Sequence, residues 1–479
     1  MTETAAHKAL STDPIKVSPP LGAALAILGI NRSLPVLHGA QGCTAFAMVL
    51  LVRHFREPIP VQTTALGELD TTLGAGDRLA DAVRTIQTRY NPEVIGVCPT
   101  ALTDTAGEDL DGNLQRIAKD LGQGADAPLL VHTPAPDFVG GLQEGWAAAV
   151  TGLVDAAAAP AETRRGHINV LAGSHLTVAD LDNLKALIDA FGLTATIIPD
   201  LADSLDGHMP SDWSPVSSGG TTRDSLGDMG AAEATLALGS HMRSAAELLE
   251  ARTQVPATVI DGWTGLDGAD QVTAWLARIA GNKVPAAIER ARSRLQDALA
   301  DSHLEATGAR VAIAAEPDIL RAVATLCRDL GCQIPVAVTT TRGSGQSTRT
   351  CDGRPPSLAD IPADRLLLGD LEDLREAAAA VGGVDLVIGP SPAKRTAAEL
   401  DAPLVRAGFP QTDRAGNQYQ ALGGYGGTRE LAFRIANALH DHFTDDLLGA
   451  PAGPARPDPA NAPPDTAPAP ISDLSGRYQ

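Results

Sequence analysis

The cysteine at position 43, in the segment HGAQGCTAF (38–46), has the residue type and the neighbours of a ligand for an iron–sulfur cluster. A cubane cluster needs about four protein ligands, which are normally thiolates. No other cysteine lies at ligand spacing from Cys43 in the sequence. If Cys43 binds a cluster, a partner chain must therefore complete the site. The alternative is that Cys43 packs beside an apolar helix as a small buried residue.

The residues around Cys43 suit a metal-ligating sulfur. Gly39 and Gly42 flank it, and glycines let the backbone bend tightly and approach a bulky inorganic group. We expect a helix over 44–55, whose N-terminal dipole would favour a thiolate at Cys43. His38 lies five residues before the cysteine and can donate a hydrogen bond to the cluster region. A structural buried histidine is the alternative for His38.

The other four cysteines predict no metal site of their own. Cys98 ends the apolar segment PEVIGVC, so we expect it to be buried in a strand. Cys327 and Cys332 have a spacing found in some cluster proteins, but they fall at a predicted helix end and strand start, where packing is the better interpretation. Cys351 is expected in an exposed loop, without a role.

The composition excludes several classes of partner. The chain has 479 residues, a formal net charge of −21 and a pI near 4.8, and nucleic acids and anionic membranes both require basic surfaces. No apolar run reaches the ~18–20 residues that span a bilayer, and the N-terminus lacks the apolar core of a secretory signal. We therefore expect a cytoplasmic protein. Five cysteines are few and odd in number, so we expect reduced thiols.

Strand and helix patterns alternate along most of the chain and predict βαβ units with parallel sheets. Apolar segments of strand length occur at 92–98, 128–133, 167–175, 195–200, 234–239, 257–262, 311–317, 334–340, 365–370, 385–390 and 402–408. Amphipathic helices are predicted at 76–90, 107–122 and 284–303. The strands at 195–200, 234–239 and 257–262 each end at a polar residue or glycine, where open α/β sheets place ligand-contacting loops.

This pattern predicts an α/β fold of three Rossmann-like domains with mainly parallel sheets flanked by helices. The expected ranges are a flexible N-terminus at 1–16, domains at 17–163, 164–305 and 306–449, and a tail at 450–479. Residues 451–470 include eight prolines, so we expect the tail to be disordered.

The chain closely resembles the nitrogenase molybdenum–iron protein superfamily and, within it, the NifN family. The resemblance covers about residues 17–447, and a long ordered series of segments is more specific than one short motif. The series includes PLGAALAILGI (20–30), LPVLHGAQGCTAF (34–46), RHFREPIPVQTTAL (53–66), TALTDTAGEDLDG (100–112), PDLADSLDG (199–207), SSGGTTRDSLGDMG (217–230), DSHLEATGARVAIAAEPD (301–318) and GFPQTDRAGNQYQALGGYGGTRELAFRIAN (408–437).

The resemblance implies a site that departs from that of the catalytic members. In the nitrogenase β subunit, three cysteines of this region bind the eight-iron P-cluster, and they would align near Ser18, Cys43 and Ala101. Only Cys43 keeps a thiol. Serine ligates iron weakly and alanine cannot, so an intact P-cluster is not supported.

The resemblance also implies a function and partners. NifN is the β-like half of an α₂β₂ scaffold for iron–molybdenum cofactor assembly, in which a NifE-like α subunit gives three cysteines and this chain one to an interfacial [4Fe–4S] cluster. Cys43 matches that single ligand. The cofactor precursor would be held mainly in the NifE-like subunit. Docking of the nitrogenase iron protein and exchange with cofactor-precursor donor and recipient proteins are expected.

Two other functions stay open from the sequence. The first is an electron-transferring oxidoreductase subunit, either a nitrogenase β chain or the β-like subunit of dark-operative protochlorophyllide reductase. The second is a cluster-free α/β binding or structural protein. In the scaffold interpretation the chain is not an enzyme and has no catalytic residues of its own.

Overall fold

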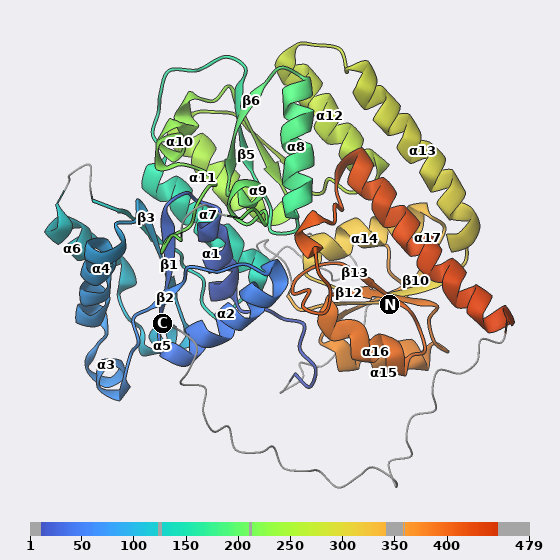
Figure 1. The fold of residues 1–479 in the computed structure, drawn as a ribbon, viewed down its shortest axis with the longest axis horizontal. Helices are drawn as coiled ribbons and strands as arrows, with labels where there is room; N and C mark the ends of the chain where they lie inside the picture. Colours follow the sequence, from blue (N-terminus) through green and yellow to red (C-terminus); the bar gives the residue numbers. More distant parts are fainter. Residues whose placement is uncertain (1–10, 123–126, 210–212, 342–357, 359, 449–479) are drawn as a thin grey trace, which may run out of the picture.

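Three parallel β-sheets, each flanked by helices, make up the molecule (Figure 1). The computed structural model describes residues 11–122, 127–209, 213–341, 358 and 360–448. All strand pairings in the sheets that the described residues form are parallel. Parallel strands need crossover connections, which helices provide here. The predicted fold class is confirmed.

The first sheet has the strand order β2-β1-β3-β4. Its strands are β1 (Ser33–His38), β2 (Gln62–Thr63), β3 (Val94–Pro99) and β4 (Leu129–His132). The helices of this part are α1 (Pro19–Leu28), α2 (Gln41–Phe55), α3 (Glu68–Leu73), α4 (Gly76–Tyr90), α5 (Ala101–Ala106), α6 (Leu110–Leu121) and α7 (Leu142–Ala157). The chain leaves β1 toward one side and β3 toward the other, so these two strands form a topological switch point.

The second sheet repeats this topology with the order β6-β5-β7-β8. Its strands are β5 (His167–Leu171), β6 (Thr194–Ile198), β7 (Ala234–Leu238) and β8 (Ala257–Ile260). Its helices are α8 (Val178–Ala190), α9 (Leu201–Ser204), α10 (Arg223–Gly227), α11 (Arg243–Thr253) and α12 (Leu266–Ala280). The switch point of this sheet lies between β5 and β7.

The third sheet has five strands in the order β11-β10-β9-β12-β13. They are β9 (Arg310–Ala314), β10 (Gln333–Thr339), β11 (Arg365–Leu368), β12 (Leu386–Gly389) and β13 (Leu404–Arg406). The helices are α13 (Ala286–Ala306), α14 (Pro317–Asp329), α15 (Leu371–Ala380), α16 (Lys394–Glu399) and α17 (Gly424–Leu448). The two long helices α13 and α17 lie side by side on the outside of the molecule (Figure 1).

The first and second sheets share one continuous hydrophobic core, in which α1 and α7 cross. All ten residues of α1 are buried. A Cβ atom at Gly22 would overlap the carbonyl of Leu142, and one at Gly145 would overlap the carbonyl of Pro19. Because both positions are glycine, the two helix backbones can touch, which fixes the first sheet against the second.

Two differences from the sequence-based expectation lie beside Cys43. The strand β1, at the switch point, was not predicted, because Pro35 interrupts its apolar run and proline is unusual inside a central strand. The neighbour β2 pairs only with Val36 and Leu37, so β1 is an edge strand at Pro35, where a missing N–H costs little. The helix expected over 44–55 begins earlier, at Gln41, so Cys43 lies inside its first turn.

The three sheets fall within the predicted ranges 17–163, 164–305 and 306–449, whose boundaries stay predictions. Of the segment expected to be flexible, residues 11–16 pack against the third sheet: Ile15 is buried there, and the Leu371 N–H donates to the Asp13 carbonyl at 3.0 Å. The tail at 450–479 and Cys351 lie outside the described residues. Within the described residues, no helix combines the length and the apolarity that a membrane crossing requires.

Candidate functional site

Cys43 is the third residue of α2, and its side chain is exposed. Its backbone N–H donates to the Ala40 carbonyl at 3.2 Å, which places the residue in the first helical turn. The interpretation of Cys43 as a buried packing residue is therefore wrong for this chain. The thiol is accessible to a group outside the chain.

A cavity of about 390 Å³ borders Cys43. Ser18 and Thr100 line the same cavity, and Ala101 follows Thr100 as the first residue of α5. The fold thus gathers the three sequence positions near 18, 43 and 101 around one space, at the carboxyl edge of the first sheet's switch point. The Ser18 hydroxyl donates to an Asp137 carboxylate oxygen at 2.6 Å, so this hydroxyl already has a protein partner.

The two glycines near Cys43 have different surroundings. A Cβ atom at Gly39 would overlap the side chain of Thr100, so this position needs glycine to bring β1 against the loop after β3. A Cβ atom at Gly42 would meet nothing within 4 Å. The open space at Gly42 adjoins the exposed thiol and leaves room for a bulky group there.

His38 is fully buried at the end of β1. Its Nδ1 atom lies 2.9 Å from the Thr64 hydroxyl, and its Nε2 atom lies 2.9 Å from a Glu108 carboxylate oxygen. The His38 carbonyl accepts hydrogen bonds from the hydroxyls of Thr100 and Thr103. These contacts favour the structural role, and a contribution of His38 to a cluster stays a prediction.

The helix that carries Cys43 also exposes large apolar side chains. Phe46 is 69% exposed and Val49 is 52% exposed, and Met48 and Val52 are partly exposed beside them. Such a contiguous apolar face is uncommon on a monomer and is typical of a protein–protein interface. Cys43 lies at one end of this face, on the same helix.

The other described cysteines are buried, as predicted. Cys98 lies in β3 beside Leu37, and burial raises the pKa of its thiol to about 12. Cys327 and Cys332 both belong to the hydrophobic core of the third sheet. None of the three lines the cavity beside Cys43. Within the described residues, Cys43 is therefore the single accessible thiol.

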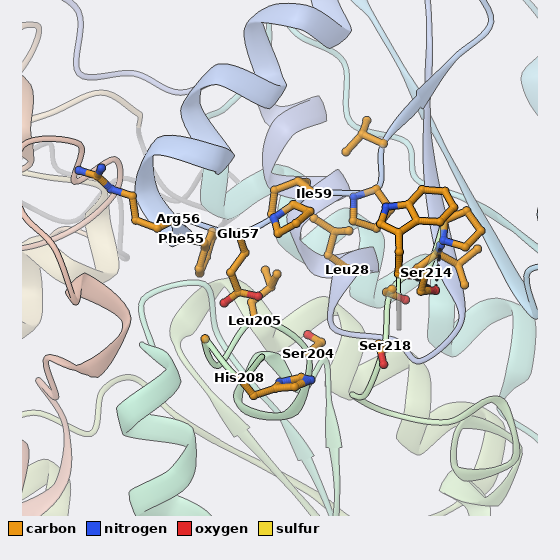
Figure 2. A pocket seen from close by; sticks show the side chains of 18 of the residues that line it. Leu28, Phe55, Arg56, Glu57, Ile59, Ser204, Leu205, His208, Ser214 and Ser218 are labelled. Carbon is orange, nitrogen blue, oxygen red and sulfur yellow. Dashed lines mark hydrogen bonds between the residues drawn. The ribbon is translucent and has the colours of Figure 1, made fainter. Parts of the chain in front are cut away.

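A larger cavity of about 800 Å³ lies between the segment after α2 and the loops of the second sheet (Figure 2). Its walls are mostly apolar, and the side chains of Glu57 and His208 reach it from opposite sides. Burial raises the pKa of the Glu57 carboxyl. Cys43 does not line this cavity, so its size does not make it the site that the sequence predicts.

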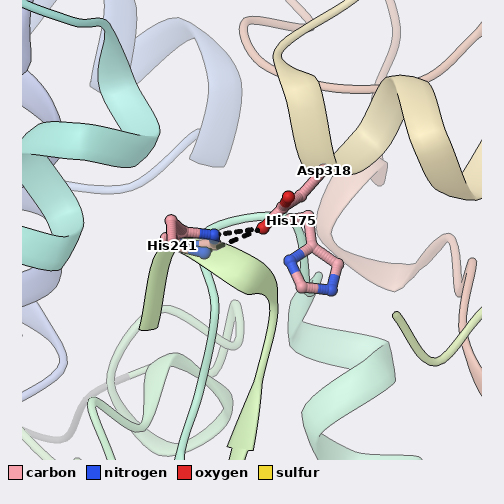
Figure 3. A group of neighbouring side chains, drawn as sticks. All are labelled: His175, His241 and Asp318. Carbon is pink, nitrogen blue, oxygen red and sulfur yellow. Dashed lines mark hydrogen bonds and ion pairs between the residues drawn. The ribbon is translucent and has the colours of Figure 1, made fainter. Parts of the chain in front are cut away.

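Sequence reasoning missed a cluster of three buried side chains, His175, His241 and Asp318 (Figure 3). A signal for it exists in the sequence, because Gly-Ser-His follows β5 at 173–175 and occurs again after β7 at 239–241. The carboxyl ends of neighbouring parallel strands meet at one edge of a sheet. The repeated tripeptide could have indicated that the two histidines lie together.

Comparison with known proteins gives a match over nearly the whole described chain. The family model described as "Nitrogenase component 1 type Oxidoreductase" matches residues 18–440. A protein of Rhodobacter capsulatus named "Nitrogenase iron-molybdenum cofactor biosynthesis protein NifN" is 42% identical, over 94% of this chain and 96% of its own length. Proteins with the same name from Sinorhizobium fredii and Klebsiella pneumoniae are 40% and 35% identical, over 90% and 91% of this chain and 94% and 92% of their own lengths.

Solved structures show the same fold. A chain of the structure titled "Nitrogenase Cp1 at pH 6.5" superposes with a TM-score of 0.84 at 30% identity, covering 94% of this chain and 97% of that chain. A chain of "Nitrogenase Cp1 at pH 5" superposes with a TM-score of 0.68 at 14% identity, which is a likeness of fold alone.

Proposed function

Because the chain belongs to the nitrogenase component 1 type oxidoreductase family and, within it, to the NifN proteins, we propose that it acts in iron–molybdenum cofactor biosynthesis as one subunit of an assembly scaffold. The observation that carries this proposal is the exposed Cys43 thiol at the start of an apolar helix face. The Cys43 thiol lies at the surface and, within the described residues, no second cysteine lines the cavity beside it.

Cys43 fits the role of one ligand of a [4Fe–4S] cluster shared with a NifE-like partner. A cubane needs about four ligands, so three must come from outside this chain. When bound, such a cluster supplies one-electron transfer. The chain's own residues hold the thiol at a helix N-terminus, keep the space at Gly42 open, and form the neighbouring cavity of about 390 Å³.

The residue types at positions 18 and 101 support a scaffold more than a P-cluster. At the positions that align with two further P-cluster cysteines the chain has Ser18, whose hydroxyl is bonded to Asp137, and Ala101, which has no donor atom. Neither side chain offers a strong iron ligand. This chain would therefore contribute a single thiolate, and the cofactor precursor would be held mainly by the partner.

The apolar face of α2 supports assembly into an α₂β₂ heterotetramer. Phe46, Met48, Val49 and Val52 would be covered by the NifE-like subunit, which removes apolar surface from water. The nitrogenase iron protein would dock on the assembled complex, and donor and recipient proteins would exchange the precursor with it. In this proposal the complex resides in the cytoplasm, and this subunit turns over no substrate.

The test replaces Cys43 with alanine in the chain co-expressed with its NifE-like partner. We expect the purified Cys43→Ala complex to lose about four iron atoms and the electron paramagnetic resonance signal of one cubane per αβ pair. The thermal midpoint of the isolated variant chain should stay near wild type, because Cys43 is exposed. The control is Cys351→Ala, a cysteine for which the sequence predicts no role, and this variant should keep full iron content.

Two outcomes would contradict the proposal. Unchanged iron content in Cys43→Ala would remove the shared-ligand role. Reduction of a nitrogenase or protochlorophyllide reductase substrate by the wild-type complex would instead support an electron-transferring oxidoreductase, which the family description keeps as the alternative.

A further inference from the structure

The second sheet brings two histidines together at its switch point. His175 follows β5 and His241 follows β7, and these neighbouring strands send the chain to opposite sides of the sheet. The carboxyl ends of such a strand pair form the crevice in which open α/β sheets bind ligands. The pair of Gly-Ser-His segments therefore lies where a bound group is expected.

Asp318 reaches the same place from the third sheet, as the second residue of α14 after β9. One donor atom each from His175, His241 and Asp318 lie within 4.8 Å of one another (Figure 3). The exposed fractions are 7%, 1% and 1%. Three potential metal ligands from two different sheets thus meet in the interior.

Gly239 leaves a space between the three side chains. Its φ of +105° is a conformation that favours glycine. A Cβ atom at this position would lie 3.0 Å from His175 Cε1, 2.9 Å from Asp318 Oδ2 and 2.8 Å from His241 Cε1. The three ligand residues therefore surround one point that any other amino acid would fill.

The hydrogen bonds leave a buried negative charge at this point. The Asp318 carboxylate accepts from the Ser240 hydroxyl at 2.7 Å and from His241 Nδ1. The Ser174 N–H donates to His241 Nε2 at 3.1 Å, so Nε2 acts as the acceptor of the ring and Nδ1 as its donor. Among the described residues, no lysine or arginine forms an ion pair with Asp318, whose contact with His241 is a pair of ions only if that ring is protonated. A buried carboxylate without a cation is costly.

His175 supplies the second feature of an incomplete site. Neither of its ring nitrogens has a hydrogen-bond partner in the described part of the chain, although both are buried. A buried imidazole whose nitrogens have no partner keeps a lone pair for a ligand. A cavity of about 20 Å³ adjoins the ring, which is room for about one water molecule.

We propose that His175, His241 and Asp318 bind one divalent transition-metal ion, of the zinc or ferrous type, which joins the second sheet to the third. Two imidazoles and one carboxylate are a donor set that both ions accept, with a water molecule in a further position. The ion neutralises the Asp318 charge and gives His175 its missing partner.

Binding requires one proton shift within His241. The ion takes the place of the proton between His241 Nδ1 and Asp318, and this proton moves to Nε2. The Ser174 hydroxyl lies 3.3 Å from Nε2 and can accept the hydrogen bond of the new N–H, and the Ser174 backbone N–H gives up Nε2 as its acceptor. A ligating histidine commonly donates its other ring N–H in this way. No proton leaves the site, so charge and atoms balance.

The test measures metal uptake by the full-length chain in complex with its partner, under anaerobic conditions. Zn(II) and, in a separate arm, Fe(II) compete with a chromophoric chelator for the wild type and for His175→Gln. We expect the wild type to bind one more metal ion per chain than His175→Gln. This difference should appear in the arm, Zn(II) or Fe(II), that contains the ion the site prefers. Co(II) in the wild type should give the visible bands of nitrogen and oxygen ligation.

The matched control is His167→Gln. His167 is another buried histidine of the second sheet, but its ring nitrogens both have hydroxyl partners, on Thr194 and Thr196. This variant should bind as much metal as the wild type. A chelator should lower the thermal midpoint of the wild type and of His167→Gln but leave that of His175→Gln unchanged.

Two results would overturn the proposal. One is the same metal stoichiometry in the wild type and His175→Gln. The other is the absence of Zn(II), Fe(II) and Co(II) uptake by the wild type beyond the cluster, which decides the question even if His175→Gln fails to fold. The site is separate from Cys43, so either result leaves the proposed scaffold function standing.

Discussion

At the residue scale, the same side chain has opposite properties at positions 43 and 98. Cys43 is exposed in the first turn of α2, whereas Cys98 lies in β3 with its thiol pKa raised to about 12 by burial. A thiol buried in a strand cannot be reached by an iron ion, whereas a thiol exposed at a helix start can. The environment, more than the residue type, decides which cysteine is available.

The two glycines beside Cys43 give a matched pair of substitutions. Gly39→Ala should destabilise the chain by about 1–3 kcal/mol, because its Cβ atom overlaps Thr100 in a packed region. Gly42→Ala should leave stability unchanged or raise it by up to about 1 kcal/mol, because the position is helical and open. Urea unfolding of the isolated chain measures both. Equal midpoints for the two variants would show that Thr100 moves aside without cost.

At the element scale, α2 connects the candidate site to the third sheet. His54, near the end of this helix, accepts a hydrogen bond from the Gln411 N–H at 2.9 Å, and its ring contacts Phe55 and Phe409. The helix that presents Cys43 at its start is thus held at its end by the loop after β13. A change at this contact can alter how α2 is presented without touching Cys43.

This contact predicts a pH dependence of stability. Burial lowers the pKa of His54 to about 4, so the folded chain binds the proton more weakly than the unfolded chain, whose histidine titrates near 6.5. Stability from this residue is therefore present above pH 6.5 and is lost as the pH falls toward 4. Between pH 7.5 and pH 5, the free energy of unfolding of His54→Phe should fall by about 1–2 kcal/mol less than that of the wild type.

Urea unfolding at the two pH values measures this difference, and the phenylalanine keeps the ring contacts. The other histidines titrate in both proteins, so they cancel in the comparison. An identical loss in the wild type and His54→Phe would mean that His54 is not buried in its neutral form.

At the scale of the whole molecule, the carboxyl edges of the three sheets border the two sites described above. The edge of the first sheet meets the cavity beside Cys43, and the edges of the second and third sheets meet at His175, His241 and Asp318. The close crossing of α1 and α7 fixes the first sheet against the second. One face of α2 stays exposed and apolar, which is typical of a protein–protein interface.

The exposed face predicts the effect of a charge on assembly. Phe46→Glu should weaken binding of the NifE-like partner by more than about tenfold, because a carboxylate replaces an exposed apolar side chain that the proposed interface would bury. The control is Leu304→Glu on α13, at a position that is 81% exposed and lies on a different helix. Both variants should keep the thermal midpoint of the wild-type chain.

Titration of the partner onto each immobilised variant measures the two affinities. Equal retention of the partner by Phe46→Glu and Leu304→Glu would place the interface away from α2. Loss of soluble Phe46→Glu protein would show instead that Phe46 stabilises the monomer.

Most of the fold could be predicted from the sequence, because buried parallel strands are short apolar runs bounded by glycine or polar residues. The strands β3 to β13 and the helix α4 agree with their predicted ranges within a few residues. The strand β1 was not predicted, because proline is unusual inside a central strand. Only the structure shows that the short β2 pairs with Val36 and Leu37 and leaves Pro35 without a partner on that side. The sequence also indicated Cys43 as the candidate cluster ligand, together with the family resemblance.

Only the tertiary structure decided whether each of these residues is accessible and what it meets. Exposure of Cys43, burial of His38 between Thr64 and Glu108, and the open space at Gly42 depend on how α2 leaves the first sheet. His175 and Asp318 are 143 residues apart in the sequence and meet because two sheets face each other. Local sequence patterns determine strands and helices, whereas contacts between distant segments arise only when those elements pack.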